Sequence, residues 1–230
     1  MKQKLIIAAI LLLTTAIGLA QKSKPKTTFG IKAGLNFTNV TIKDADGEKV
    51  KGNKFKTGIN VGFYADVALG QKGFFQPGLI FTSKGTVNKV ITAGETINKT
   101  TISAGYIEVP LNIIYKSNGQ EGGFIIGGGP YVAYGVSGIV KERSGGYKET
   151  SLKFKTKTSV NFNFNSNVYY LTPFDGGLGF LIGFEGKSGV SFLLNGQLGL
   201  INQALQVSGV NFEISKYRNY GVGFSVGYRF

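Results

Sequence analysis

A regular alternation of apolar with small or polar residues is the feature that most constrains the fold of this chain. In residues 28–38, TFGIKAGLNFT, an apolar residue stands at every second position. The same period of two recurs in seven later stretches: 59–69, 75–82, 107–115, 124–136, 174–185, 192–200 and 220–230. Successive side chains of a strand point to opposite faces, whereas a helix repeats every 3.6 residues. The pattern therefore predicts eight strands, each with one apolar face, and an all-β protein.

The connections between these stretches alternate in length, and this order distinguishes two architectures. Short Gly-containing turns occupy 70–73, 117–122 and 186–189, while long polar segments occupy 39–56, 84–103, 138–171 and 202–217. A soluble β-sandwich has no reason to collect its long loops at one end. Outer-membrane barrels join their strands by short periplasmic turns and longer extracellular loops. The sequence predicts an eight-stranded antiparallel transmembrane β-barrel, an up-and-down meander in the bacterial outer membrane with periplasmic N- and C-termini.

The longest connection contains a further alternation. Within 138–171, five apolar residues share one parity, opposite lysines and asparagines: Leu152, Phe154, Val160, Phe162 and Phe164. Two interpretations fit this pattern. Either the barrel strands continue beyond the membrane as a protruding hairpin, or an additional strand pair raises the barrel to ten strands.

Glycine is about twice as frequent here as in average proteins, with 35 glycines among 230 residues. An eight-stranded barrel has an interior only just wide enough for side chains, so large inward residues need small ones opposite them. The alternation turns a set of glycines inward, namely Gly30, Gly34, Gly62, Gly179, Gly221 and Gly223. We therefore expect a lumen filled by side chains and no open channel.

The first 28 residues are expected to lie outside the barrel. Residues 1–20 combine a basic start, an apolar run and small residues before Gln21, which is the pattern of a cleaved signal peptide. A membrane anchor is the alternative, but a helix over 5–20 would reach only about 24 Å, less than the roughly 30 Å hydrocarbon core. The predicted organisation is a signal peptide at 1–20, a polar basic leader at 21–28 and the outer-membrane barrel domain at 29–230.

The chain is strongly basic, which bears on its partners. It has 26 Lys and Arg against 12 Asp and Glu, and loss of Lys2 and Lys4 with the signal peptide leaves 24 − 12 = +12. For an exported chain we expect contact with outer-membrane lipid and with lipopolysaccharide, and no nucleic acid. The basic residues crowd two connections, Lys43, Lys49, Lys51, Lys54 and Lys56 in one and Lys141, Arg143, Lys148, Lys153, Lys155 and Lys157 in the other. A solvated loop surface is the simpler alternative, and the pattern defines no protein partner.

Several kinds of chemistry are excluded by composition. The chain has no His and no Cys, so Ser-His and Cys catalysis and His-ligated metal sites are ruled out. Asp44, Asp46 and Glu48 in KDADGE lack the further ligands of a calcium loop, and a solvated turn is the simpler interpretation. We predict no catalytic residue, no cofactor and no metal, and a structural or interaction role without enzymatic activity.

Charged residues at inward positions are the candidate site. Lys32, Asp66, Glu185 and Arg229 are predicted to meet near the end with short turns, and Lys84, Glu108 and Asp175 to meet in the other half of the lumen. Buried charges need partners. We expect two salt-bridged clusters that fill the lumen as structural plugs, with a polar ligand site or a proton path as the alternative. A soluble lipocalin-like ligand carrier would need an apolar lumen, which these charges argue against.

Six motifs in order resemble the PorT-like outer membrane beta-barrel domain family. They are FGIKAGLNFT at 29–38, QPGLIFTSKG at 76–85, YIEVPLNIIYK at 106–116, GGGPYVAYG at 127–135, FDGGLGFLIGFE at 174–185 and the alternating aromatic and apolar residues at 220–230. The resemblance implies an eight-stranded barrel, and one branch of the family assists a protein secretion and gliding apparatus. Phe230, with Tyr228 two residues before it, resembles the signal by which the barrel-insertion machinery recognises its clients.

Overall fold

The structure is a computed structural model that describes residues 27–44, 46–50, 52–92, 95–155, 169–204 and 214–230. The predicted signal peptide at 1–20 and most of the leader at 21–28 lie outside these residues, as do Val160, Phe162 and Phe164 of the longest connection. Among the described residues, no helix has the length and apolar character needed to cross a membrane.

Ten strands and one short helix make up the described chain. They are β1 (Thr28–Asp44), β2 (Asn53–Ala68), β3 (Gly73–Thr92), β4 (Glu95–Lys116), the 3-10 helix η1 (Gly119–Glu121), β5 (Gly123–Arg143), β6 (Tyr147–Phe154), β7 (Tyr169–Leu171), β8 (Phe174–Glu185), β9 (Val190–Gly199) and β10 (Ile214–Arg229). Each of the eight alternating stretches lies in a strand, so the prediction of an all-β protein is confirmed.

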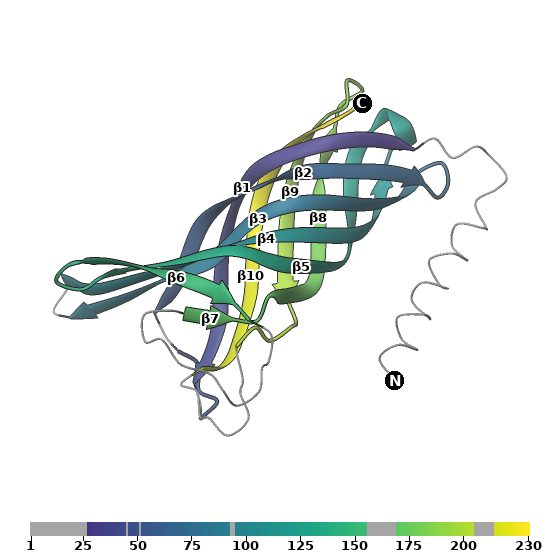
Figure 1. Ribbon diagram of the computed structural model, residues 1–230. Coiled ribbons are helices and arrows are strands. Elements are labelled where there is room, and N and C mark those ends of the chain that lie inside the picture. The colour runs from purple at the N-terminus through teal and green to yellow at the C-terminus, as the bar shows by residue number, and fades with distance from the viewer. Residues whose placement is uncertain (1–26, 45, 51, 93–94, 156–168, 205–213) are drawn as a thin grey trace, which may run out of the picture.

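Eight of these strands form a closed ring, and Figure 1 shows the barrel from the side. Their order is β4-β3-β2-β1-β10-β9-β8-β5, and pairing of β4 with β5 closes the ring. All pairings within it are antiparallel. The first and last strands pair over almost their whole length, from Gly30 opposite Arg229 to Lys43 opposite Lys216. A closed ring leaves no strand edge in the barrel wall, as a membrane barrel requires.

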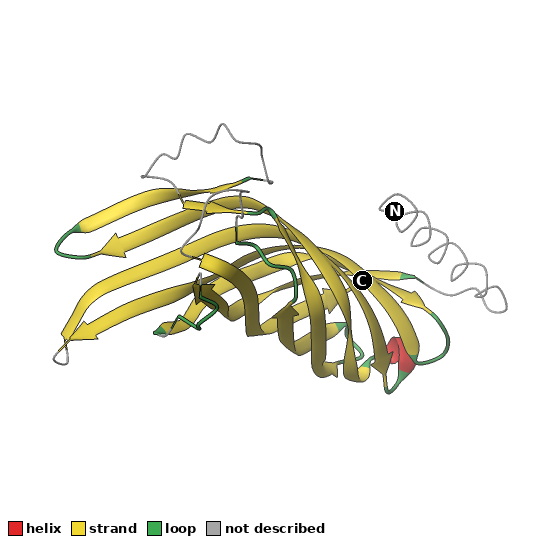
Figure 2. Cartoon of the chain, turned by 90° about the horizontal axis from the view of Figure 1, so that it is seen from below, coloured by secondary structure: helices red, strands yellow, loops and turns green. Residues whose placement is uncertain are grey.

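The two ends of the barrel differ in their connections. The three short turns and helix η1 lie at the end where the chain terminates, and the long strand extensions lie at the opposite end (Figure 2). At the turn end, the N–H of Phe230 donates to the carbonyl of Phe29 at 2.8 Å, so β1 begins where β10 ends. We call these ends the turn end and the loop end.

Much of the chain that was predicted to be long loop is strand instead. Strands β3 and β4 remain paired as far as Thr92 opposite Glu95, which converts most of 84–103 into a hairpin beyond the barrel (Figure 1). Its β-branched residues, such as Val87, Thr101 and Ile102, favour strands. Both faces of this extension are mixed in polarity, so it carries no clear alternation.

In the described part of 138–171, the end of β5 and strand β6 form a hairpin that protrudes beyond the barrel, as the first of the two interpretations expects. Strand β6 pairs with β5 from Ile139 opposite Ser151 to Arg143 opposite Tyr147, and β7 pairs with β6 in parallel. Neither β6 nor β7 enters the ring of eight strands, so the barrel does not grow to ten.

In each strand of the barrel wall, the apolar residues of the alternation face outward, and the polar and small residues face the lumen. On β10, Val222 is 58% exposed and Phe224 is 44% exposed, while Ser225 between Phe224 and Val226 is 1% exposed. On β2, Phe63 is 67% exposed and the adjacent Tyr64 only 5%. A water-soluble barrel would show the reverse arrangement, so this finding disfavours the lipocalin-like alternative.

Inward side chains fill the lumen by pairing large residues with small ones. Gly30 lies opposite Tyr64 on the neighbouring strand, and a Cβ at Gly30 would come within 2.4 Å of Cζ of that ring. Further up, the ring of Phe154 occupies the space over Gly135 in the same way. This close fit confirms the expected use of an inward glycine at Gly30, whereas a Cβ at Gly179 would meet nothing nearer than 3.8 Å.

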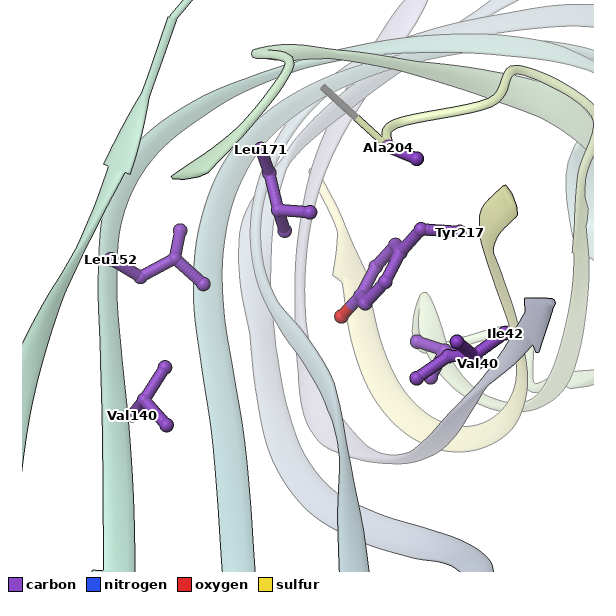
Figure 3. Packing of buried hydrophobic residues seen from close by; sticks show 7 residues of the cluster. All are labelled: Val40, Ile42, Val140, Leu152, Leu171, Ala204 and Tyr217. Atoms are coloured by element: carbon purple, nitrogen blue, oxygen red, sulfur yellow. The ribbon is translucent and has the colours of Figure 1, made fainter. Parts of the chain in front are cut away.

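Three buried apolar clusters lie at successive levels along the barrel. The first, at the turn end, consists of Ala68, Phe74, Ile114, Ile125, Leu181 and Leu193. The second consists of Ala104, Tyr106, Tyr131 and Ala133. The third, at the loop end, consists of Val40, Ile42, Val140, Leu152, Leu171, Ala204 and Tyr217 (Figure 3). In this third cluster Leu171 and Ala204, which form an isolated bridge, bring connecting segments over the mouth of the barrel.

Candidate functional site in the barrel lumen

A buried ion cluster lies in the lumen at the turn end, and we call it the lower cluster. Lys116 Nζ lies 2.7 Å from Asp66 Oδ2 and 2.8 Å from Glu185 Oε2. Arg229 Nε donates to Glu185 Oε1 at 2.8 Å. Lys116, Asp66 and Glu185 have side chains only 1% exposed, so this network is shielded from water.

Strand ends position the lower cluster. Lys116, Glu185 and Arg229 are the last residues of β4, β8 and β10, and Asp66 lies two residues before the end of β2. Because the corresponding turns all lie at one end of the barrel, these four side chains reach the same level. Gln76 Nε2 donates to Asp66 Oδ1 at 2.8 Å, so both oxygens of this buried carboxylate are satisfied, as burial requires.

Lys32 does not join the lower cluster, contrary to the prediction. It makes no ion pair within the part of the chain that the structure describes. The register explains this, because Lys32 pairs with Gly62 on β2, whereas Asp66 pairs with Thr28. Four residues of strand separate the two levels, which is about 13 Å at 3.3 Å per residue. Lys116 holds the place that was predicted for Lys32.

Lys116 was missed although its parity identifies it. The alternation in 107–115 turns Glu108, Asn112 and Ile114 inward, and Lys116 continues that series by one step. A search for a cation that balances Asp66 and Glu185 would have found it.

A second ion cluster, the upper cluster, lies in the other half of the lumen. Lys84 Nζ lies 2.8 Å from Glu108 Oε2 and 3.0 Å from Asp175 Oδ2, so the structure brings together all three residues predicted there. The ammonium also lies 4.3 Å from the centre of the Tyr131 ring, a cation–π contact. Gln197 Nε2 donates to Glu108 Oε1 at 2.6 Å.

Amide side chains connect the upper cluster to the loop end. Asn219 Nδ2 lies 3.2 Å from Asp175 Oδ2 and 2.6 Å from Gln203 Oε1. Gln203 Nε2 donates in turn to the hydroxyl of Tyr106 at 3.0 Å. Gln203 belongs to the connection after β9 and is fully buried, so this network holds a connecting segment across the mouth of the barrel.

Between the two clusters lies a cavity of about 70 Å³, lined by residues that include Lys32, Asn36, Asn112, Tyr131, Asn195 and Ser225. At about 10–15 Å³ for each water, it holds only a few water molecules. Lys32 also compensates charge. In the described lumen it raises the number of cations to four, with Lys84, Lys116 and Arg229, against the four carboxylates of Asp66, Glu108, Asp175 and Glu185.

The chemistry that this site supports is ion pairing. Within the described residues, no group of three or more carboxylate, His or Cys side chains could hold a metal ion. At the barrel terminus, Phe230 is 66% exposed and its ring packs edge to face on that of Tyr228 at 5.5 Å. Both aromatic side chains are thus accessible on the outer surface at the turn end.

Comparison with known proteins gives one family match and several similar folds. The family described as outer membrane protein beta-barrel domain matches residues 19–205. No curated protein matches the chain. Among solved structures, Ail, the attachment invasion locus protein of Yersinia pestis, is 13% identical at a TM-score of 0.42, with 89% of this chain and 99% of that chain covered.

Two further structures are similar. Neisserial surface protein A is 13% identical at a TM-score of 0.44, over 89% of this chain and 99% of that chain. The outer membrane protein OprG from Pseudomonas aeruginosa is 15% identical at a TM-score of 0.38, over 90% of this chain and 97% of that chain.

Proposed function

We propose that this chain, which belongs to the outer membrane protein beta-barrel domain family, is a closed barrel that acts as a structural or interaction protein and has neither pore nor enzymatic activity. The observation that carries the proposal is the stacking of two ion clusters and three apolar clusters along one narrow lumen. These layers leave room for only a few waters between them.

The ion clusters fit a structural role better than a transport role. A transport site needs a partner that can leave, whereas Lys84 and Lys116 are each held by two carboxylates at 2.7–3.0 Å. Removing one partner from such a buried pair costs about 3–5 kcal/mol because it leaves an uncompensated charge. The clusters therefore act as plugs that tie β2, β3, β4, β8 and β10 together across the lumen.

The loop end is the surface through which we expect interaction. The paired extensions of β3, β4, β5 and β6 project from the barrel as a hydrogen-bonded platform, and they carry many of the basic residues. With both termini in the periplasm, this platform faces the exterior, where lipopolysaccharide and other molecules are available. The terminal Tyr228 and Phe230 at the opposite end are accessible to the barrel-insertion machinery from the periplasmic side.

A more specific role in a secretion and gliding apparatus rests on the PorT-like motifs alone. The matching family is the wider one of outer membrane barrel domains. We therefore keep the accessory role as a narrower hypothesis within the proposed function.

Capture of partners from intact outer membranes tests the interaction role. The variant for comparison has 144–146, the turn between β5 and β6, replaced by a bulky epitope, while the barrel stays intact. A partner that cross-links to the wild type and is lost from this variant supports the proposal. Recovery of the protein from the soluble periplasmic fraction without detergent would overturn it.

A further inference from the structure

Strand β6 has a neighbouring strand on one side only over its first half. From Tyr147 to Ser151 it pairs with β5, and on its other side β7 begins opposite Leu152. Among the strands of the described chain, no other pairs with this stretch. The sheet that β3, β4, β5 and β6 form beyond the barrel therefore ends at Tyr147–Ser151 in an open edge (Figure 1).

The hydrogen bonds at the tip of the β5–β6 hairpin show which residues of β6 bond to β5. There the N–H of Ser144 donates to the carbonyl of Gly146 at 3.1 Å. In an antiparallel pair, hydrogen-bonded residues alternate with residues whose main-chain groups point to the other side. Lys148 and Thr150, two and four residues beyond Gly146, therefore bond to β5.

A hydrogen bond at the other end of β6 gives the same assignment independently. The N–H of Lys155 donates to the carbonyl of Leu171 on β7 at 2.9 Å, so the odd-numbered residues of β6 turn their main-chain groups away from β5. In the open edge these residues are Tyr147, Glu149 and Ser151, and all three are exposed. Their N–H and C=O groups are accessible to an incoming strand.

The exposed face beside the open edge is basic. Lys141 and Arg143 on β5 and Lys153 on β6 have exposed side chains on this face, and Lys99 on β4, which is also exposed, pairs directly with Arg143. The carboxylate of the hairpin on the same face belongs to Glu149, and it lies 3.4 Å from Lys141 Nζ. The face therefore keeps an excess of positive charge.

This charge selects the kind of strand that the open edge accepts. A second copy of the chain would bring an identical basic face alongside, and like charges on neighbouring strands are destabilising. Lysines at a strand edge are thus a device against self-association. An incoming strand places every second side chain on the exposed face, where carboxylates would meet the cations.

We propose that the open edge of β6 accepts an extended acidic segment of another polypeptide, which adds to the sheet as a further strand. In strand addition, main-chain hydrogen bonds provide affinity and alternate side chains provide specificity. This inference rests on the proposed function, in which the loop end is the interaction surface. It adds the manner of binding and the chemical class of the partner.

Binding of designed peptides to the full mature protein in phosphatidylcholine nanodiscs tests the proposal. The probe is a peptide of about eight residues, a usual strand length, in which glutamate alternates with valine. One comparison peptide has lysine in place of glutamate. Another keeps the glutamates but carries N-methyl groups on the amides that would bond to β6. Backbone hydrogen exchange of the protein reports where each peptide lies.

The glutamate peptide should bind and should slow hydrogen exchange at the amides of Tyr147, Glu149 and Ser151. The amides of Lys148 and Thr150 are already bonded to β5, so their exchange should not change. The lysine peptide and the N-methylated peptide should bind more weakly by about tenfold or more, because the first loses the charge match and the second loses the main-chain hydrogen bonds.

Ser151→Pro is the test variant, because proline at this position removes an N–H that points away from β5 and spares the hairpin. It should weaken binding of the glutamate peptide by about tenfold or more, whereas the matched control Ser151→Ala should bind like the wild type. Slow exchange at Thr150 verifies that both variants keep the hairpin. If Ser151→Pro loses the hairpin, the N-methylated peptide on the wild type decides the question instead.

Several outcomes would overturn the proposal. Slow exchange of the edge amides without any peptide would mean that the edge is already covered. Equal binding of the lysine peptide, no binding of the glutamate peptide, or binding that N-methylation leaves unchanged would exclude addition of an acidic strand. Association of two copies through β6 would identify a different occupant. Failure of the protein to insert into nanodiscs would instead count against the proposed function, so the two failures are distinguishable.

Discussion

Lys116 Nζ lies 2.7 Å from Asp66 Oδ2, and both side chains are 1% exposed. Lys116 is the last residue of β4, and Asp66 lies two residues before the end of β2. Strand β3 separates these two strands in the barrel wall. A contact across the lumen at this level requires that the register of all the intervening pairings is correct. The pair is therefore a sensitive test of the β2–β3 and β3–β4 registers.

Replacing Lys116 by Met should lower the free energy of unfolding by about 3–5 kcal/mol, because Asp66 and Glu185 would then remain buried without their shared cation. Urea titration of the protein in lipid vesicles measures this change. The control is Lys141→Met, which breaks an ion pair with Glu149 that is about half exposed, and its cost should be far smaller than that of Lys116→Met because solvent screens an exposed pair. Similar costs for the two variants would show that water enters the lower cluster.

Replacing Lys32 by Met should cost far less than replacing Lys116. Lys32 lines the cavity and has no ion pair within the described chain, so its replacement leaves no carboxylate without a bonded cation, and we expect a loss well below that of Lys116→Met. The same urea titration compares the two variants side by side. A cost for Lys32→Met that equals that of Lys116→Met would place Lys32 back in the lower cluster and contradict the β1–β2 register.

Replacing Phe224 by Arg should destabilise the folded barrel by about 2–4 kcal/mol, because this outward side chain lies in the middle of β10 and would carry a charge into lipid. Phe224→Leu, which keeps the surface apolar, is the matched control and should stay close to the wild type. A spin label at the same position should be relaxed by oxygen and protected from a water-soluble nickel complex. Strong relaxation by nickel would mean that this face meets water.

The carboxyl of Glu149 on the β5–β6 hairpin should titrate below the ordinary value for glutamate. The hydroxyl of Tyr147 donates to Glu149 Oε2 at 2.7 Å, and this bond, opposed by desolvation but supported by Lys141, lowers the pKa of the carboxyl. A depressed folded-state pKa adds stability above the unfolded pKa, and that stability is lost as pH falls through the folded pKa. Carbon NMR titration should show that the pKa of the Glu149 carboxyl rises in Tyr147→Phe. An unchanged pKa would contradict the hydrogen bond between Tyr147 and Glu149.

The barrel was predictable from sequence because its determinants are local. Alternation over ten residues fixes which face of a strand is apolar, and the three short turns identify one end. Residues of the upper cluster, Lys84, Glu108 and Asp175, could be grouped because parity and distance from the turns placed them at one level. Such reasoning works wherever each strand meets two solvents of different polarity.

The errors have physical causes. The extensions of β3 and β4 lie beyond the membrane level and have mixed polarity on both faces, so their residues carry no alternation and were expected to form loops. Lys116 was missed, and Lys32 was misplaced because its level depends on the β1–β2 register. The pairing of Lys43 with Lys216 across the β1–β10 seam is likewise not contained in the sequence pattern of either strand alone.

Conductance across planar lipid bilayers tests the central claim that the lumen is closed. The wild-type protein, inserted from detergent, should give no steady ohmic current, because the ion clusters and apolar clusters leave no continuous column of water. A variant that combines Lys116→Ala, Phe74→Ala and Leu171→Ala, chosen to empty both ends of the lumen, serves as the positive control once its insertion is verified. Stable single-channel steps from the wild type, abolished by a bulky replacement at Gly30 or Gly62 in the lumen, would contradict the closed barrel.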